Sequence, residues 1–238
     1  MIAADDPLVV ALTEAVQAGD LERLDHLLAS HPQLALERFG DAQKSCEALH
    51  LATDWPGHWP DVVAVVERLV QAGARVDARF AGPHTETPLH WAASSDDVAA
   101  LDALLDAGAD IEAGGAVLTG GSPIDDAVVF AQWRAARRLL ERGADIQFWH
   151  AAALGLTERV MRDLAAGATS GDEITGACWH AARAGHLTTV VALVDAGADL
   201  QEVLWEDRTV LDAAVAAGHD EVAAFVRSRG AGSAGIDR

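Results

Sequence analysis

A glycine followed by alanine closes one apolar helical segment after another along this chain. Before Gly108-Ala109, for example, Leu101, Leu104 and Leu105 have the spacing of one face of a helix. A glycine at such a point can end the helix in the left-handed conformation. The sequence therefore predicts a repeated helical unit that ends at each pair. The pairs are Gly73-Ala74, Gly108-Ala109, Gly143-Ala144, Gly167-Ala168, Gly197-Ala198 and Gly230-Ala231.

A second, shorter helix is predicted upstream of each apolar segment, because alanine-rich stretches recur there. Examples are Leu89-His90-Trp91-Ala92-Ala93 and Trp179-His180-Ala181-Ala182. Small alanine side chains let paired and stacked helices approach closely. One helix pair cannot bury its apolar face alone, so neighbouring copies are expected to stack and share a continuous core.

The repeated unit resembles the ankyrin repeat. The run Glu86-Thr87-Pro88-Leu89-His90-Trp91-Ala92-Ala93, followed by Leu104-Leu105-Asp106-Ala107-Gly108-Ala109-Asp110-Ile111, is similar to that family's signature. The resemblance covers residues 8 to 231. It implies an all-α ankyrin-repeat solenoid of about seven helix–turn–helix repeats with short β-hairpin fingers. Abundant alanine and arginine, with Lys44 as the one lysine, suggests a bacterial ankyrin repeat protein.

The register of the repeats follows from the distance between the motif histidine position and the closing glycine. We expect one domain over residues 1–231, with caps at about 8–45 and 205–231 and a flexible tail at 232–238. The second repeat, near His50, has five extra residues, which the segment 55–60 accommodates. The distance is 18 residues from each of His90, Asp125, Trp149, Trp179 and Asp212.

The connections that form the fingers of the repeats are unequal in length. From the closing glycine to the next motif position takes 17 residues after Gly73 and Gly108, but only 6 after Gly143. The finger between the fourth and fifth repeats is thus expected to be nearly absent. Its loss either leaves a notch beside helices that begin at Phe148 and Ala177, or lets the glycine-rich loop 114–121 fold over them.

Polar and aromatic residues occupy the position after the motif histidine, where ankyrin repeats have an apolar residue. Equivalent positions of stacked repeats point the same way, so these residues are predicted to form one stripe along the inner helices. Trp133 is expected to help wall the notch beside them. The stripe residues are Trp91, Asp126, His150 and His180, and the residues before them in three repeats are Asp125, Trp149 and Trp179.

The residue types of this stripe leave three interpretations open. Indole faces in an open groove suit a ring, a cation or a proline-rich segment. A carboxylate beside an imidazole can orient a tautomer or relay a proton, which makes Asp126, His150 and His180 the alternative catalytic residues. The same groups can instead be structural, as tryptophans that fill the space of the missing finger and as a hydrogen-bonded ladder between repeats.

Other site chemistry is not expected. His50 and His90 occupy the motif position itself and are interpreted as structural groups that hydrogen-bond neighbouring loops. Neighbouring helices stack roughly 8 to 10 Å apart, whereas each ligand atom must lie about 2 Å from a zinc ion, so three consecutive stripe residues cannot surround one ion. An ion shared by His150 and His180 is the remaining metal alternative. No cofactor is expected, since neither a phosphate-binding glycine loop nor a Gly-x-Ser-x-Gly motif is present.

Charge and cysteine content narrow the partner and the compartment. The chain has 37 acidic against 17 basic residues, a formal net charge of -20, which opposes contact with nucleic acid and anionic membranes. This charge attracts a basic protein surface or a cationic small molecule more easily, and it can equally serve to keep an apolar solenoid soluble. Cys46 and Cys178 lie far apart and outside any metal-type spacing, which indicates a reduced compartment. With no leader-like or membrane-spanning run, we expect a cytoplasmic monomer.

Two classes of function are therefore carried forward. The ankyrin resemblance implies a non-catalytic module that binds a protein partner on its concave face. The alternative is a small-molecule-binding or acid–base enzyme site at the notch between the fourth and sixth repeats, lined by tryptophan, histidine and aspartate. The polar stripe at a normally apolar position is the feature that the second class explains better.

Overall fold

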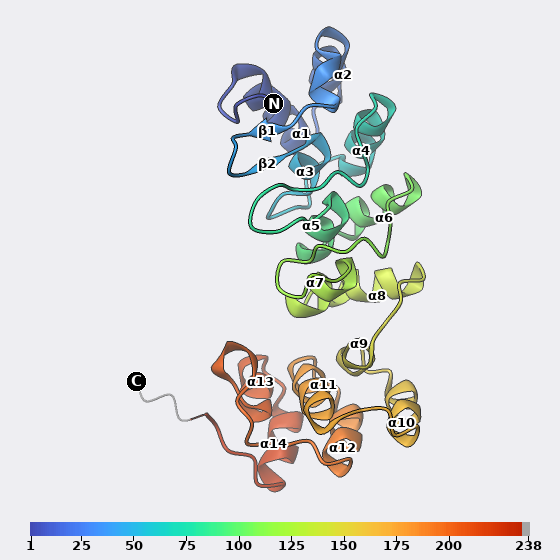
Figure 1. Ribbon diagram of the computed structural model, residues 1–238, viewed down its shortest axis with the longest axis vertical. Helices are drawn as coiled ribbons and strands as arrows, with labels where there is room; N and C mark the ends of the chain where they lie inside the picture. The colour runs from blue at the N-terminus through green and yellow to red at the C-terminus, as the bar shows by residue number, and fades with distance from the viewer. Residues whose placement is uncertain (235–238) are drawn as a thin grey trace. The chain divides into compact units, whose positions relative to one another are not determined.

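The computed structural model describes residues 1–234, and within them fourteen helices follow one another as seven pairs (Figure 1). This is the all-α repeat architecture that the sequence predicts. The chain divides into two compact units, Met1–Asp145 and Ile146–Arg238. The first unit contains four helix pairs and the second contains three. A single domain over residues 1–231 stays a prediction.

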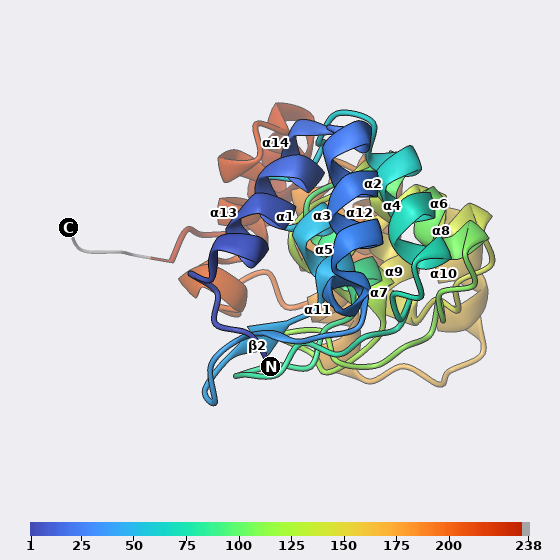
Figure 2. The ribbon, with the colours of Figure 1, turned by 90° about the horizontal axis from the view of Figure 1, so that it is seen from above.

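The first unit stacks an inner row of helices on an outer row (Figures 1 and 2). Helices α1, α3, α5 and α7 contact one another in order, as do α2, α4, α6 and α8, and each pair also packs within its own repeat. The helices are α1 (Pro7–Ala18), α2 (Leu21–Ser30), α3 (Ala48–Thr53), α4 (Val62–Gln71), α5 (Pro88–Ser94), α6 (Val98–Asp106), α7 (Pro123–Val129) and α8 (Trp133–Glu141), with a 3-10 turn η1 (Pro32–Ala35).

Proline and glycine begin and end these helices as the sequence predicts. Pro88 and Pro123 occupy the first turns of α5 and α7, where the missing N–H of proline has no partner to lose. Gly73, Gly108 and Gly143 follow the outer helices with φ angles of 98°, 93° and 97°, a left-handed conformation that favours glycine. The spacing between inner and outer helices is therefore encoded locally in each repeat.

The second unit repeats the same arrangement. Helices α9, α11 and α13 form its inner row, and α10, α12 and α14 form its outer row. The helices are α9 (Phe148–Ala153), α10 (Thr157–Ala165), α11 (Gly171–Arg183), α12 (Leu187–Asp195), α13 (Val210–Ala216) and α14 (Asp220–Ser228), with a 3-10 turn η2 (Trp205–Asp207) before α13.

Helix α11 begins earlier than expected. The repeat register predicts a start near Ala177, whereas the helix begins at Gly171. Ser170 caps it, because its Oγ accepts the Glu173 N–H at 3.3 Å while Glu173 Oε2 accepts the Ser170 N–H at 2.7 Å. This reciprocal pair satisfies backbone donors that no helical carbonyl reaches. The expected finger before the sixth repeat is therefore largely replaced by helix.

Within residues 1–234, a two-stranded sheet is found in the first connection, where β1 (Phe39–Gly40) pairs antiparallel with β2 (Ser45–Cys46). Isolated bridges join Ile2 to Phe39 and Ser45 to Ala81 of the next connection. The other fingers, expected as short hairpins, lack such strands. In the loop 114–121 the backbone bonds locally instead, for example from the Gly115 N–H to the Gly120 carbonyl at 3.0 Å. The connection 142–147 also lacks a strand, as its length predicts.

Part of the expected tail lies against α13. Thr209 Oγ1 donates to the Gly232 carbonyl at 3.0 Å, and the Ala234 N–H donates to Asp212 Oδ2 at 2.8 Å. The rest of the tail predicted to be flexible, residues 235–238, lies outside the described residues. Within residues 1–234, no helix combines the length and the apolar character that crossing a membrane requires.

Candidate functional site

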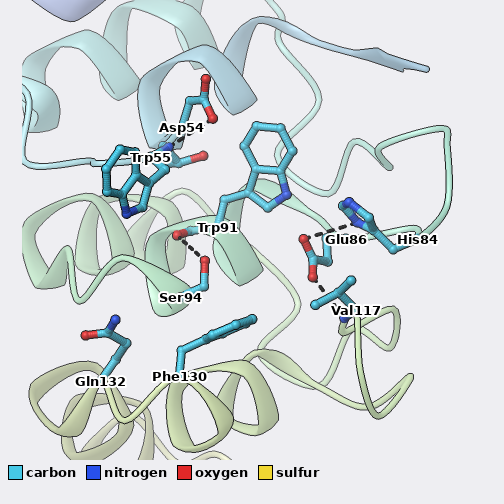
Figure 3. A pocket seen from close by; sticks show the side chains of 10 residues that line it. Asp54, Trp55, His84, Glu86, Trp91, Ser94, Val117, Phe130 and Gln132 are labelled. Atoms are coloured by element: carbon cyan, nitrogen blue, oxygen red, sulfur yellow. Dashed lines mark hydrogen bonds and ion pairs between the residues drawn. The ribbon is translucent and has the colours of Figure 1, made fainter. Parts of the chain in front are cut away.

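A cavity of about 430 Å³ opens on the first unit, beside the C-terminal ends of three inner helices (Figure 3). Its walls combine aromatic rings with acidic and neutral polar groups, and none of the lining residues is a lysine or an arginine. A space of this size accommodates a small molecule or a partner's side chain. The lining residues are Thr53, Asp54, Trp55, His84, Glu86, Trp91, Ser94, Val117, Phe130 and Gln132.

Three successive repeats contribute the aromatic walls of this cavity. Trp91 lies on α5, Trp55 lies two residues beyond the end of α3, and Phe130 directly follows α7. In Figure 3, Trp91 stands between Trp55 and the Glu86 side chain, with Phe130 across the cavity. Trp55 is 80% exposed and Phe130 is 41% exposed. Large apolar side chains that gather exposed around a concavity are typical of binding surfaces.

Glu86 brings a buried carboxylate to the cavity. The residue is 6% exposed, its Oε1 accepts the Val117 N–H at 2.9 Å, and its Oε2 lies 3.1 Å from His84 Nδ1. Its backbone carbonyl lies 3.3 Å from His50 Nε2. Side chain and backbone are both anchored, so the carboxylate has a fixed orientation.

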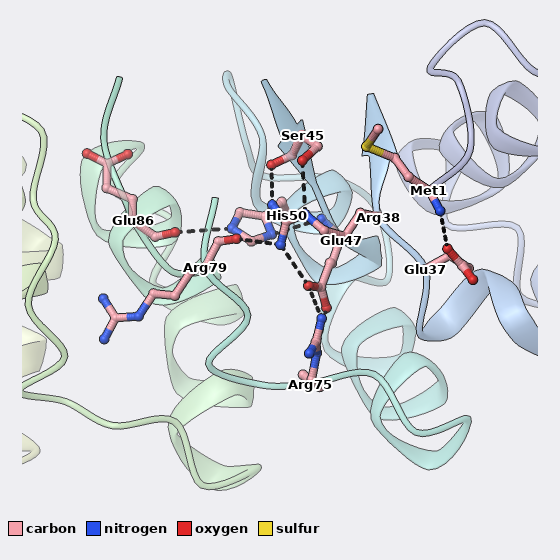
Figure 4. A network of polar contacts seen from close by, with 9 residues as sticks. All are labelled: Met1, Glu37, Arg38, Ser45, Glu47, His50, Arg75, Arg79 and Glu86. Atoms are coloured by element: carbon pink, nitrogen blue, oxygen red, sulfur yellow. Dashed lines mark hydrogen bonds and ion pairs between the residues drawn. The ribbon is translucent and has the colours of Figure 1, made fainter. Parts of the chain in front are cut away.

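A polar network ties together the connections next to Glu86 (Figure 4). Glu47 is 2% exposed and accepts one hydrogen bond from Arg38 Nη1 and another from Arg75 Nε, each at 3.0 Å. Arg38 Nη1 also donates to the Arg79 carbonyl at 3.0 Å. Two guanidinium groups therefore compensate a carboxylate that would be costly to bury alone. The network holds the scaffold from which Glu86 projects.

The motif histidines are structural, as predicted. His50 Nδ1 accepts the Glu47 N–H at 3.3 Å, and His90 Nδ1 accepts the Thr87 N–H at 3.2 Å. On the other edge of each ring, Nε2 lies within 3.3 Å of a carbonyl oxygen in the following connection. Burial lowers the pKa of both histidines to about 4, so the neutral ring can accept at Nδ1 and donate at Nε2.

Asp126 lies on α7 next to Glu86, outside the lining of the cavity. Burial raises the pKa of the Asp126 carboxyl, and the neighbouring Glu86 raises it further by charge repulsion and by a hydrogen bond. Asp126 is 1% exposed, and its Oδ2 has no hydrogen-bond partner among the described residues. The Asp126 carboxyl therefore keeps its proton at neutral pH, which avoids a second negative charge beside Glu86.

The structure places the remaining first-unit candidates outside the cavity. Trp91 lines the cavity together with Glu86, whereas Asp126 interacts with Glu86 from outside the lining. Asp125 occupies the third position of α7, where other repeats have the motif histidine, and a side chain at Gly121 would collide with its carboxylate. Trp133 begins the outer helix α8 and does not line the cavity.

The second-unit candidates form an aromatic cluster that Trp205 joins. The ring centre of His180 lies 4.9 Å from that of Trp149 and 4.7 Å from that of Trp205, and Trp179 lies 5.2 Å from Trp205. Trp179 is 1% exposed and His180 is 4% exposed. This is the packing that the core-filling interpretation predicts for Trp179. A continuous stripe from Asp126 to His150 stays a prediction.

Burial also controls the charge of His180. Burial, with smaller contributions from the nearby Arg183 and His150, lowers the pKa of His180 to about 3. The imidazole is therefore neutral at neutral pH. The Arg183 guanidinium lies 5.4 Å from the centre of the Trp179 ring.

The capping role moves by one residue in the fifth repeat. The register places Trp149 in the motif position, but α9 begins at Phe148 and makes His150 its third residue. His150 Nδ1 accepts the Gln147 N–H at 3.0 Å, as His50 and His90 do in their own helices. Trp149 Nε1 donates to Gln147 Oε1 at 3.1 Å. The sequence did not predict this structural bond of His150.

Several cavity residues were not predicted from the sequence. Glu86 stands directly before the Thr-Pro motif of its repeat, and Trp55 belongs to the insertion after α3. Both positions were noticed only as parts of the repeat pattern. His84 and Phe130 carry no local signal, because they reach the cavity only when neighbouring repeats stack.

Comparisons with known proteins agree with this architecture. Residues 12–115 match the family model described as ankyrin repeats in three copies. The chain is similar in fold to the crystal structure of the human ASB11 ankyrin repeat domain, with a TM-score of 0.55 and 24% sequence identity. The match covers 90% of this chain and 96% of that chain. A comparison with curated proteins found no match.

The stacked helix pairs define a helical repeat architecture, with a cavity on the inner helices of the first unit. Residues 12–115 match the ankyrin-repeat family model, and most of the chain is similar in fold to an ankyrin repeat domain. Ankyrin repeats are generally protein-interaction modules.

Proposed function

We propose that this protein is a non-catalytic recognition module that binds a basic segment of a partner protein on the inner helices of its first unit. The observation that carries the proposal is the cavity beside Trp91, where exposed aromatic side chains surround a buried carboxylate. A concave, partly apolar site with a few oriented polar groups is the usual form of a recognition site.

The charge of the site supports a basic partner. Asp54 and Glu86 line the cavity, and no lining lysine or arginine neutralises them. The formal net charge of -20 adds a long-range attraction for cations that weakens as salt screens it. Association with a basic segment should therefore be faster and tighter at low ionic strength.

Fluorescence polarisation with defined peptides tests this proposal. Labelled nonapeptides with net positive, zero and negative charge are titrated with the protein at low and at physiological salt. We expect the basic peptides alone to bind, with an affinity that falls as salt rises and that falls further in Trp91→Ala. Equal binding of acidic peptides, or no binding of the basic ones, contradicts the proposal.

A second candidate function is a small-molecule or acid–base site, and the raised pKa of Asp126 next to Glu86 favours it. Its proposed residues are Asp126 in the first unit and, separately, His150 and His180 in the second. A thermal-shift screen of small organic acids and amines tests it. A ligand whose stabilising effect disappears in Asp126→Asn or in His180→Leu supports this candidate, and a ligand unaffected by either substitution counts against it.

A further inference from the structure

We propose that the first-unit cavity is an arginine pocket, which takes the guanidinium group of one arginine side chain of the partner. This inference rests on the proposed recognition function and specifies the chemistry of its central contact. Three properties of the cavity carry it: carboxylates in a lining without lysine or arginine, a serine hydroxyl that offers only lone pairs, and flat aromatic walls.

The carboxylates select for positive charge. Glu86 is held at one oxygen by the Val117 N–H, and its side chain is 8% exposed. Partial burial raises the pKa of Asp54, the second acidic group of the lining, because the charged form loses hydration. A cation that enters the cavity is attracted by these carboxylates. A neutral or anionic group leaves them without compensation.

The Ser94 hydroxyl selects for a hydrogen-bond donor. Its Oγ donates to the Trp91 carbonyl at 3.0 Å. A hydroxyl has one hydrogen, so what remains for a ligand is oxygen lone pairs. A guanidinium carries five N–H donors and no acceptor, which complements a lining of this kind.

The aromatic walls favour arginine over lysine. Trp91 is held in place by His50, at a ring-centre distance of 4.8 Å, and by Phe80 at 5.6 Å. A planar guanidinium stacks on such a fixed indole and loses less hydration than a compact ammonium group on entering a partly buried site. Trp55 and Phe130 add exposed apolar surface for the residues that flank the arginine.

A set of three peptides tests the selectivity. Labelled nonapeptides carry two lysines and a central arginine, lysine or citrulline, and their binding is measured by fluorescence polarisation. We expect the citrulline peptide to bind at least about tenfold more weakly than the arginine peptide, since it lacks the charge, and the lysine peptide to bind several-fold more weakly.

Protein variants place the selectivity in the cavity. Glu86→Gln keeps the shape of the side chain but removes its charge, and Trp55→Ala changes a residue that is 80% exposed and leaves the core intact. Glu86→Gln is expected to abolish the preference for arginine over citrulline, whereas Trp55→Ala is expected to weaken the binding of both peptides. Glu141→Gln removes an equal charge from the outer helix α8, where the side chain is 63% exposed, and is expected to keep the preference. Circular dichroism checks that each variant is folded.

The outcomes separate this inference from the proposed function. If basic peptides bind but arginine, lysine and citrulline are equivalent, the arginine pocket is wrong and the recognition function stands. If no basic peptide binds, the proposed function itself fails. The pocket is also overturned if Glu86→Gln keeps the arginine preference, or if free N-acetyl-arginine amide binds as tightly as the peptide. It is overturned as well if sedimentation experiments show that the peptide only dissociates a dimer of this chain.

Discussion

The replacement Asp126→Asn should stabilise the protein, although it alters a residue that is 1% exposed. In the folded chain, burial and the Glu86 carboxylate raise the pKa of Asp126 above its ordinary value of 3.8. In the unfolded chain the same carboxyl is ionised at pH 6 and is hydrated by water. Folding must therefore take up a proton at this pH, and that uptake costs free energy.

The size of this cost follows from the interval between the ordinary pKa and the working pH. One pKa unit corresponds to about 1.4 kcal/mol, so an interval of about two units between 3.8 and pH 6 corresponds to about 3 kcal/mol. Asparagine is neutral at every pH and has an amide that can donate to Glu86. Since its geometry differs from that of a protonated carboxyl, we expect a gain of about 1–3 kcal/mol in the free energy of unfolding.

Urea unfolding followed by far-ultraviolet circular dichroism measures the effect at several pH values. A raised folded pKa gives stability that is complete below the unfolded pKa and is lost as pH rises toward the folded one. The advantage of the variant should thus be small near pH 4 and grow as the pH increases. Asp5→Asn, at an exposed position, is the control and should show no such trend. A pH-independent difference, or a variant less stable at every pH, would refute the reasoning.

Three further predictions concern stability. Below the ordinary histidine pKa of 6.5, the unfolded chain binds protons that the folded His50 and His180 do not. As the pH falls, the free energy of unfolding should therefore decrease by up to about 1.4 kcal/mol per pH unit for each histidine, until its folded pKa of about 4 (His50) or about 3 (His180) is reached. Urea unfolding at pH 7 and at pH 5 checks this. Trp179→Ala, which empties a site that is 1% exposed, should cost about 3–5 kcal/mol by the same assay, and a cost below 1 kcal/mol contradicts the core-filling role. Gly185→Ala should lower the melting temperature more than Gly218→Ala. Both glycines have positive φ angles, but of the two only Gly185 has a ring, that of His219, 2.6 Å from the position of the new Cβ. Equal effects would mean that this contact is unimportant.

The repeat fold was predictable because its signals are local and periodic. Each glycine of the Gly-Ala pairs in the first unit ends a helix, and the helix pairs that precede these glycines follow the predicted register. The early start of α11 was missed because the register directed attention to Ala177, although Ser170 and Glu173 have the spacing of a capping box. The solenoid with short fingers was predicted from the repeat pattern, and the nearly absent finger after Gly143 followed from the length of that connection.

The site was only partly predictable because it depends on stacking. Trp91 was identified as a polar or aromatic departure at an apolar repeat position, and it lies in the cavity. Glu86 and Phe130 come from different repeats, and no local pattern connects them. The expected role of His150 was incomplete, since α9 begins at Phe148 and makes His150 the third residue, whose ring accepts the Gln147 N–H.

Nuclear magnetic resonance of the indole N–H groups tests the central claim most directly. The chain has seven tryptophans, whose signals can be assigned with single tryptophan-to-phenylalanine variants. During titration with the arginine-containing nonapeptide, the signals of Trp55 and Trp91 should shift and saturate together, while those of Trp179 and Trp205 stay in place. Shifts confined to Trp149, Trp179 and Trp205, or no shift at Trp91 despite binding, would contradict a recognition site in the first unit.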